Sequence, residues 1–212
     1  MALLPILVCF AVKEEAECFQ EILVSRPRAL VLITGMGKAN AEDSIRKALR
    51  QVRPAMVLSC GFAGALNPQF PSETIVFDAA DSEIETTLLG LGGYGVKFHC
   101  ADRVAVTAAD KRALRAATGA DVVEMESAVI GAVCNDTGIP FATVRIILDG
   151  ADEDLPMDFN RLMNAKQEMS YLKLTGALLK SPGKIGELKK FQKRCQAAAL
   201  KLAATLVRII PG

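Results

Sequence analysis

The feature that most constrains the fold is an alternation of short apolar runs with longer amphipathic segments. The runs at residues 5–10, 29–33, 55–59 and 141–148 are rich in aliphatic residues, as strands covered on both faces of a sheet are. The segments between them, such as residues 13–23, repeat apolar residues at helical spacing. The alternation predicts an α/β fold in which one parallel or mixed sheet is covered by helices on both sides.

Length and composition narrow the class of protein. The 212 residues fit one domain, residues 1–212, and 51% of them are hydrophobic. A net charge of +1 offers no electrostatic footprint for nucleic acid. No apolar run reaches about 18 residues, so no membrane span is expected. Six scattered cysteines without a C-x-x-C pair are typical of reduced thiols in a cytoplasmic protein.

Shorter signals predict the remaining elements. Strands are expected at residues 73–79, 96–100 and 103–106, and two C-terminal helices from about residue 158 to 180 and from 183 to 209. Thr107 or Asp110 is expected to cap a further helix, which Gly119 ends. Residues 60–66 and the glycine-rich residues 90–95 are expected to be loops. His99 is the only histidine, so a histidine metal site is excluded, and no metal or other cofactor is expected.

The segment at residues 121–127 places two acids between apolar runs. It predicts a buried strand that turns into a helix, with Met125 between Glu124 and Glu126, and Glu126 at the junction. The apolar runs on both sides leave little room for both acids on the surface. A carboxylate at this junction either anchors the structure or binds a substrate.

Five acidic or glycine-rich positions follow the ends of predicted strands. They are Glu14, the loop at residues 35–40, the loop at residues 61–64, Glu126 and Asp149. Because ligands of such sheets bind beyond the carboxyl ends of the strands, we expect all five at one rim. For Glu14 the alternative is an acidic first turn that the helix dipole favours.

The loop at residues 35–40 lies between a predicted strand and a predicted helix. Gly35 and Gly37, next to Lys38, permit a tight turn whose N–H groups are free for an anion or another oxygen-rich ligand. The alternative is simple turn chemistry. Asn40 occupies the third glycine position of a dinucleotide fingerprint, so an NAD(H)-dependent oxidoreductase is the weakest of the functions considered.

Three acids with glycine-rich backbone suit the cleavage of a sugar C–N bond, which passes through an oxocarbenium-like ribose. One group must protonate the leaving base, one must bind the ribose hydroxyls, and one must activate water if water is the nucleophile. Burial at an apolar strand end would raise the pKa of the acid that protonates the base. Arg145 lies inside a predicted buried strand, where its guanidinium must be paired.

Five segments carry a resemblance to a known family. They are residues 10–16, 35–41, 60–66, 123–128 and 145–152, and the most specific matches are Val-Glu-Met-Glu and the later Arg145 and Asp149. The chain resembles the purine nucleoside phosphorylase/uridine phosphorylase superfamily, nearest to its 5′-methylthioadenosine/S-adenosylhomocysteine nucleosidase-like members. The resemblance implies a single three-layer α/β domain with a mixed central sheet, a nucleoside substrate and a homodimer.

The resemblance also implies roles for residues of the most specific segments. Glu126 would bind the ribose 2′- and 3′-hydroxyls, and Met125 would pack on the sugar. Asp149 would be the general acid at the purine ring, held in place with help from Arg145.

Other residues match the family less closely. Glu14 would correspond to the carboxylate that activates water, and Val104 lies roughly where the family closes over the base. Further candidates for the substrate pocket are Glu124, Gly61 and Phe62.

Three departures from the family pattern concern the pocket and the C-terminal helices. Phe62 replaces a small hydroxyl residue beside the nucleophile, and Leu148 replaces the usual serine before the acid. Both replacements would make the pocket more apolar. The helices after residue 158 look more like the hopanoid-associated phosphorylase branch, whose implied substrate is an adenosyl hopanoid.

Three functions therefore stand ahead of the oxidoreductase. Hydrolysis of a purine nucleoside, of the adenine type, is the leading hypothesis, because Glu14 favours water as the nucleophile. Phosphorolysis is the alternative, and it requires cationic partners for phosphate. A nucleoside-binding protein without activity is a further alternative, which Phe62 and Leu148 motivate.

Overall fold

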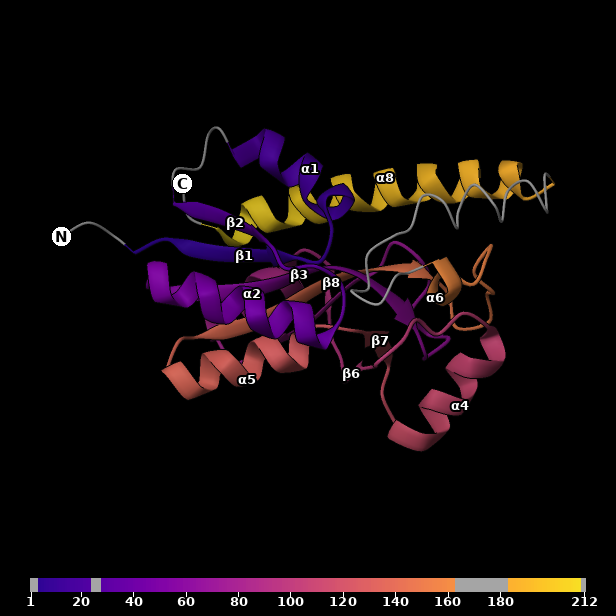
Figure 1. The fold of residues 1–212 in the computed structure, drawn as a ribbon, viewed down its shortest axis with the longest axis horizontal. Helices are drawn as coiled ribbons and strands as arrows, with labels where there is room; N and C mark the ends of the chain where they lie inside the picture. Colours follow the sequence, from indigo (N-terminus) through magenta and orange to yellow (C-terminus); the bar gives the residue numbers. More distant parts are fainter. Residues whose placement is uncertain (1–3, 24–27, 163–182, 211–212) are drawn as a thin grey trace.

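The computed structural model describes residues 4–23, 28–162 and 183–210. They form one mixed sheet with helices on both faces, as the apolar runs predicted (Figure 1). The strands are β1 (Ile6–Phe10), β2 (Ala29–Ile33), β3 (Met56–Ala65), β4 (Ile75–Ala79), β5 (Tyr94–Gly95), β6 (Phe98–Cys100), β7 (Val122–Glu124) and β8 (Phe141–Asp149). The helices are α1 (Lys13–Leu23), α2 (Lys38–Gln51), α3 (Ser82–Gly90), α4 (Ala108–Thr118), α5 (Ser127–Thr137), α6 (Phe159–Leu162) and α8 (Lys184–Ile209).

The sheet brings the ends of several strands to one rim. Its main order is β2-β1-β3-β8-β4-β5. β1, β2, β3 and β8 run parallel, so their carboxyl ends share the rim, whereas β4 is antiparallel to β8. The last residues of β3 pair with the antiparallel β7, which in turn pairs with β6. The β3–β7–β6 ladder thus extends the sheet where the parallel strands end.

Each central strand is buried on both faces. Along β1, Val8 and Phe10 pack in an apolar cluster with residues of α1 and α8, whereas Leu7 and Cys9 pack in a second cluster with residues of α2 and α5. Figure 1 shows α1 and α8 on one side of the sheet and α2 and α5 on the other. This burial on both sides explains why the strand appears in the sequence as an uninterrupted apolar run.

Alternation along β8 determines which of its side chains reach the rim. Val144 and Ile146 pack in the cluster with α1 and α8. Because successive strand residues point to opposite faces, Arg145 and Asp149 both lie on the other face. In register, Gly61 of β3 lies beside Arg145.

Two predictions of secondary structure are wrong. Residues 60–66 do not form a loop, because β3 continues to Ala65 and pairs there with β7 and β8. Residues 103–106 form no strand, since Val104 instead bonds through its N–H and C=O to the side chain of Asn160 (2.9 and 3.0 Å). α3 had no counterpart among the predicted elements, and residues 94–95 of the predicted glycine-rich loop form β5.

The helix ends agree with their predicted signals. Thr107 and Asp110 form a reciprocal capping box at the start of α4, and Gly119 ends that helix with a left-handed φ of 63°. The helix predicted from about residue 158 begins as α6, and the rest of it lies outside the described residues. α8 confirms the last predicted helix. Within the described ranges, no helix is long and apolar enough to cross a membrane.

The buried face of α8 offers a test of the packing. Leu206 is 0% exposed and Leu200 is 59% exposed on the same helix. We expect Leu206→Ala to lower the free energy of unfolding by about 2–5 kcal/mol, because it leaves a cavity in the core. The matched control Leu200→Ala should change it by less than about 0.5 kcal/mol. Urea unfolding of both variants measures this, and equal losses would contradict the packing.

Candidate active site

Four ionisable side chains are buried together at the rim. None is more than 6% exposed, and we call them the acidic cluster: Glu15, Glu124, Glu126 and Arg145. Three carboxylates and one guanidinium leave the cluster negatively charged when all four are ionised. A buried group of this charge needs internal bonds or a positively charged ligand to offset its lost hydration.

Arg145 is the shared partner of the acidic cluster. Its Nη2 donates to Glu124 Oε2 (2.8 Å), to Ser59 Oγ (3.0 Å) and to Glu126 Oε2 (3.5 Å). Its Nε is buried and has no hydrogen-bond partner among the described residues. Burial alone would lower the pKa of Arg145, but the charges of Glu124, Glu126 and Glu15 outweigh it and raise that pKa. The guanidinium therefore stays charged.

The carboxylate of Glu124 accepts all its hydrogen bonds from groups of the protein itself. Its Oε2 accepts from the N–H groups of Glu126 (2.9 Å) and Ser127 (2.7 Å) and from Arg145, and its Oε1 accepts from the Ser127 hydroxyl (2.7 Å). A carboxylate offers about four lone-pair sites, so Glu124 has no acceptor left. It anchors the start of α5, where the helix dipole favours a negative charge.

Glu126 can still accept further hydrogen bonds. Its Oε1 accepts from the N–H of Gly37 (2.8 Å), and its Oε2 accepts only the long bond from Arg145. About two lone-pair sites remain. Burial raises the pKa of Glu126 to about 7, although the charge of Arg145 opposes this rise.

Glu15, and not Glu14, is the third acid of the cluster. Glu14 is exposed on α1, so its side chain is not one of the buried acids at the rim, where the sequence placed it. Glu15 is held by three backbone N–H groups, those of Phe62 (2.8 Å), Ala11 (3.0 Å) and Val12 (3.3 Å). These bonds use three of about four lone-pair sites and leave one.

The helical period of α1 contains a signal for Glu15. Glu15 precedes the buried Phe19 by four residues, so both lie on the inner face of α1, next to the buried Ala16. Glu14 falls outside that face. Burial raises the pKa of Glu15, and the charge of Arg145 opposes the rise.

Gly61 allows Arg145 and Glu15 to come together. Its φ is 144°, and a Cβ atom there would lie 2.6 Å from Arg145 Nη1 and 2.7 Å from Glu15 Oε1. Any side chain would collide with both groups, so only glycine fits this position. The glycines predicted as a binding loop are thus strand residues that make room for the buried charges.

Asp149 ends β8 on the face that carries Arg145. Its carboxylate forms an ion pair with Lys111 of α4, and both side chains are buried. Burial raises the pKa of Asp149, and the charge of Lys111 opposes this rise. Sequence reasoning missed Lys111; its only local signal is its position three residues before Leu114, which packs against the core.

The glycine loop at residues 35–40, just before α2, contacts the acidic cluster through one hydrogen bond. Gly35 and Gly37 have φ values of 81° and 80°, the left-handed conformation that the turn requires. The N–H of Gly37 donates to Glu126, so it binds an internal carboxylate where we expected an external anion. Lys38 is directed elsewhere, to Asp102 at 2.7 Å, whose side chain is 86% exposed.

The two departures Phe62 and Leu148 face the core. Both side chains pack in the apolar cluster with residues of α1 and α8, so they do not make the rim more apolar. Phe62 meets the acidic cluster through its backbone N–H, which donates to Glu15. Met125 is buried, between Glu124 and Glu126 in the chain.

A hollow of about 610 Å³ reaches Cys100, which pairs in register with Glu124 of the acidic cluster. It lies between α4, residues 99–105 and the start of α2, and both Val104 and Lys38 line it. Ligand pockets commonly measure about 300–1,000 Å³. Glu15, Glu126 and Asp149 are not among the residues that line this hollow.

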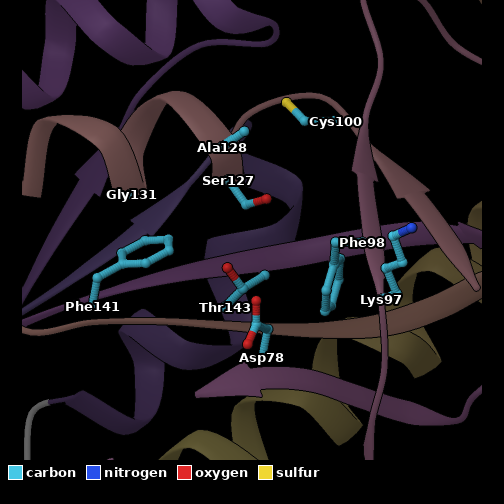
Figure 2. A pocket seen from close by; sticks show the side chains of 9 residues that line it. All are labelled: Asp78, Lys97, Phe98, Cys100, Ser127, Ala128, Gly131, Phe141 and Thr143. Atoms are coloured by element: carbon cyan, nitrogen blue, oxygen red, sulfur yellow. The ribbon is translucent and has the colours of Figure 1, made fainter. Parts of the chain in front are cut away.

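A smaller hollow of about 260 Å³ lies next to Ser127 at the start of α5. Figure 2 shows its lining, with Phe98, Phe141 and Thr143 around it and Ser127 at its side. The Ser127 hydroxyl is already bonded to Glu124. Among the described residues, no group of three His, Cys, Asp or Glu side chains is placed to bind a metal ion.

A comparison with models of protein families shows the family of this chain. The model of the phosphorylase superfamily matches residues 94–210, which is more than half of the sequence. The chain belongs to the phosphorylase superfamily. This confirms the resemblance that the five sequence segments indicated.

Curated relatives carry nucleosidase names. The chain is 26% identical over 179 residues to a 5′-methylthioadenosine/S-adenosylhomocysteine nucleosidase of Marinomonas sp., covering 68% of this chain and 77% of that protein. A nucleosidase of the same name from Geobacillus kaustophilus is also 26% identical, over 67% of this chain and 75% of its own. Both relatives are enzymes named for nucleoside cleavage.

Solved structures of two Helicobacter pylori proteins share the fold. The Helicobacter pylori 5′-methylthioadenosine/S-adenosylhomocysteine nucleosidase with butyl-thio-DADMe-Immucillin-A superposes with a TM-score of 0.71 and 16% identity, over 98% of this chain and 97% of that one. The futalosine hydrolase of Helicobacter pylori gives a TM-score of 0.71 and 15% identity, over the same shares. The predicted three-layer α/β fold is thereby confirmed.

The raised pKa of Glu126 predicts how stability depends on pH. Because the folded protein keeps a proton that the unfolded chain releases, the free energy of unfolding falls as pH rises from 4.5, the ordinary pKa, to about 7. We expect a fall of about 3 kcal/mol from this group. Glu126→Gln removes this group and should make the pH dependence smaller, while the raised pKa values of Glu15 and Asp149 still contribute. Urea unfolding at a series of pH values measures both proteins, and identical curves would contradict the assignment.

Proposed function

We propose that this member of the phosphorylase superfamily cleaves the N-glycosidic bond of a purine nucleoside of the adenine type, with water as the nucleophile. The observation that carries the proposal is the acceptor capacity that remains on three buried acids after their internal bonds are counted. Glu126 keeps about two lone-pair sites, Glu15 keeps one, and Asp149 bonds only to Lys111 among the described residues.

Glu126 suits the ribose. Two neighbouring hydroxyls, the 2′- and 3′-OH, can donate to its two remaining lone-pair sites. Gly37 and Arg145 fix the carboxylate from the other side, so the acceptors are oriented before substrate binds. The neighbouring Met125 supplies an apolar surface for the sugar ring.

Asp149 suits the leaving base. A general acid must hold a proton near the working pH, and burial raises the pKa of Asp149 in that direction. Its side chain transfers the proton to the purine as the C–N bond breaks. The base then leaves as a neutral molecule.

Glu15 suits the nucleophilic water. Three backbone N–H groups fix its carboxylate, and its remaining lone pair accepts a proton from water. We assign to Glu15 the role that the sequence gave to Glu14. The raised pKa of Glu15 brings it closer to neutral, which suits a general base.

The charge of the acidic cluster favours hydrolysis over phosphorolysis. Excess negative charge stabilises an oxocarbenium-like ribose and repels phosphate. Arg145 and Lys111 are already bonded to carboxylates. Three further described cations have other partners or positions: Lys38 pairs with Asp102, Arg46 pairs with Glu42 on the exposed side of α2, and Arg28 precedes β2 at the opposite end of the sheet.

The relatives supply the substrate class. Their names specify 5′-methylthioadenosine and S-adenosylhomocysteine, which are both adenine nucleosides, and this supports an adenine-type base here. The 5′ substituent remains open to an apolar group such as the implied hopanoid. The homodimer and the cytoplasmic location expected from the sequence stay predictions.

The acids can be tested with a neighbouring control. We expect Asp149→Asn and Glu15→Gln each to lower kcat for adenine release by about 10²–10⁴-fold, because each removes one proton-transfer group. Glu14→Gln, one residue away on the exposed side of α1, should leave kcat within about twofold. Adenine release from 5′-methylthioadenosine measures all three. Equal losses in Glu14→Gln and Glu15→Gln would contradict the assignment of the water-activating group.

The nucleophile needs a separate experiment. Adenine release is measured in phosphate-free buffer and again with phosphate added, and the sugar product is identified. We expect the same rate in both and free ribose derivative as the product. A strict requirement for phosphate, with a sugar 1-phosphate as product, would contradict hydrolysis.

A further inference from the structure

Lys111 is the least expected side chain near the rim. It is 0% exposed, although a lysine is rarely buried without a specific partner. Its Nζ donates to the main-chain carbonyls of Gly150 and Glu153, each at 2.7 Å, and forms the ion pair with Asp149 Oδ2. All three acceptors belong to the end of β8 and the turn that follows it.

The bonds of Lys111 define what it can do. An ammonium has three donors, and three acceptors within the protein take all of them. Lys111 therefore has no proton for a substrate and makes no contact with one. Any effect on the reaction passes through Asp149.

Asp149 is held from one side only. Lys111 occupies Oδ2, and no described residue donates to Oδ1. A Cβ atom at Gly64 would lie only 3.1 Å from Oδ2, so a glycine at this position of β3 leaves room for that oxygen. We propose that Lys111 is a positioning residue that fixes Oδ2 of Asp149 and directs Oδ1 to the leaving base. This inference rests on the proposed function, since it assigns Asp149 to the base.

Further polar contacts stabilise the turn whose carbonyl groups accept hydrogen bonds from Lys111. The N–H of Gly150 donates to Glu153 Oε2 (3.2 Å), and Arg194 of α8 pairs with Glu153 Oε1 at 2.5 Å. On the surface, Arg112 of α4 pairs with Asp152 of the same turn at 3.4 Å, and both side chains are more than half exposed. Arg112 is thus a matched control: it also joins α4 to this turn, but without touching Asp149.

The dependence of kcat on pH distinguishes a Lys111 that positions Asp149 from a Lys111 that only stabilises the fold. The charged or titratable groups that face Asp149 are Lys111 from α4, Glu153 from the turn, and Arg194 and Cys195 from α8. Burial raises the pKa of Asp149, and Lys111 is the strongest opposing influence. Without Lys111 the pKa rises further. Because a general acid works only while it holds its proton, the basic limb of kcat against pH then moves to higher pH.

The experiment compares three variants of the full chain. For Lys111→Met we expect kcat for adenine release to fall by about 10–100-fold with KM little changed. We also expect the basic limb to move up by about one pH unit or more. Lys111→Arg keeps the charge but not the geometry, so kcat should fall while the limb stays in place. Arg112→Met should match the wild type in both.

Two kinetic outcomes would overturn the inference: an unshifted basic limb in Lys111→Met, or wild-type kcat in Lys111→Arg. If Lys111→Met fails to fold, the kcat and limb of Lys111→Arg decide the question. A second measurement is independent of turnover. Titration of the Asp149 carboxyl by ¹³C NMR should give a higher pKa in Lys111→Met than in the wild type, and equal values would refute the inference even if no nucleoside is cleaved. Failure of the proposed function instead appears as a wild type that releases no purine.

Discussion

The burial of Arg145 among three carboxylates is the constraint on which the site depends. The guanidinium lies in a strand that is covered on both faces, so side chains must replace its hydration. Glu124, Glu126 and Glu15 come from β7, from the start of α5 and from α1, and the sheet topology brings these elements to one rim. Without Arg145, three like charges in a buried volume would take up protons. The charge balance of the site is therefore set by the fold.

Internal hydrogen bonds divide the three glutamates into different roles. Glu124 has no acceptor left and anchors α5, whereas Glu126 and Glu15 retain about two and one. Two hydroxyls of a ribose and one water match those numbers. The excess negative charge then favours a transition state in which the sugar becomes positive. The same excess distinguishes this rim from a phosphate site, where free cations are needed.

Much of the fold could be predicted because the central strands are buried on both faces and appear as apolar runs. β3 was predicted too short because glycines such as Gly61 usually indicate a loop. Here Gly61 lies in the strand and makes room for the neighbouring Arg145. The helical period of α1 could have distinguished Glu15 from Glu14, because Phe19 marks the buried face. Lys111 could not be found in this way: a buried lysine departs from local pattern, and only its distant partner explains it.

The most direct measurement is a crystal structure with a non-hydrolysable adenine nucleoside bound. The arrangement predicts that the 2′- and 3′-hydroxyls donate to Glu126, that a water lies on Glu15, and that Asp149 Oδ1 faces the purine ring. The contrary result is a nucleoside confined to the hollow lined by Lys38 and Val104, with Glu126 still bonded only to Gly37 and Arg145.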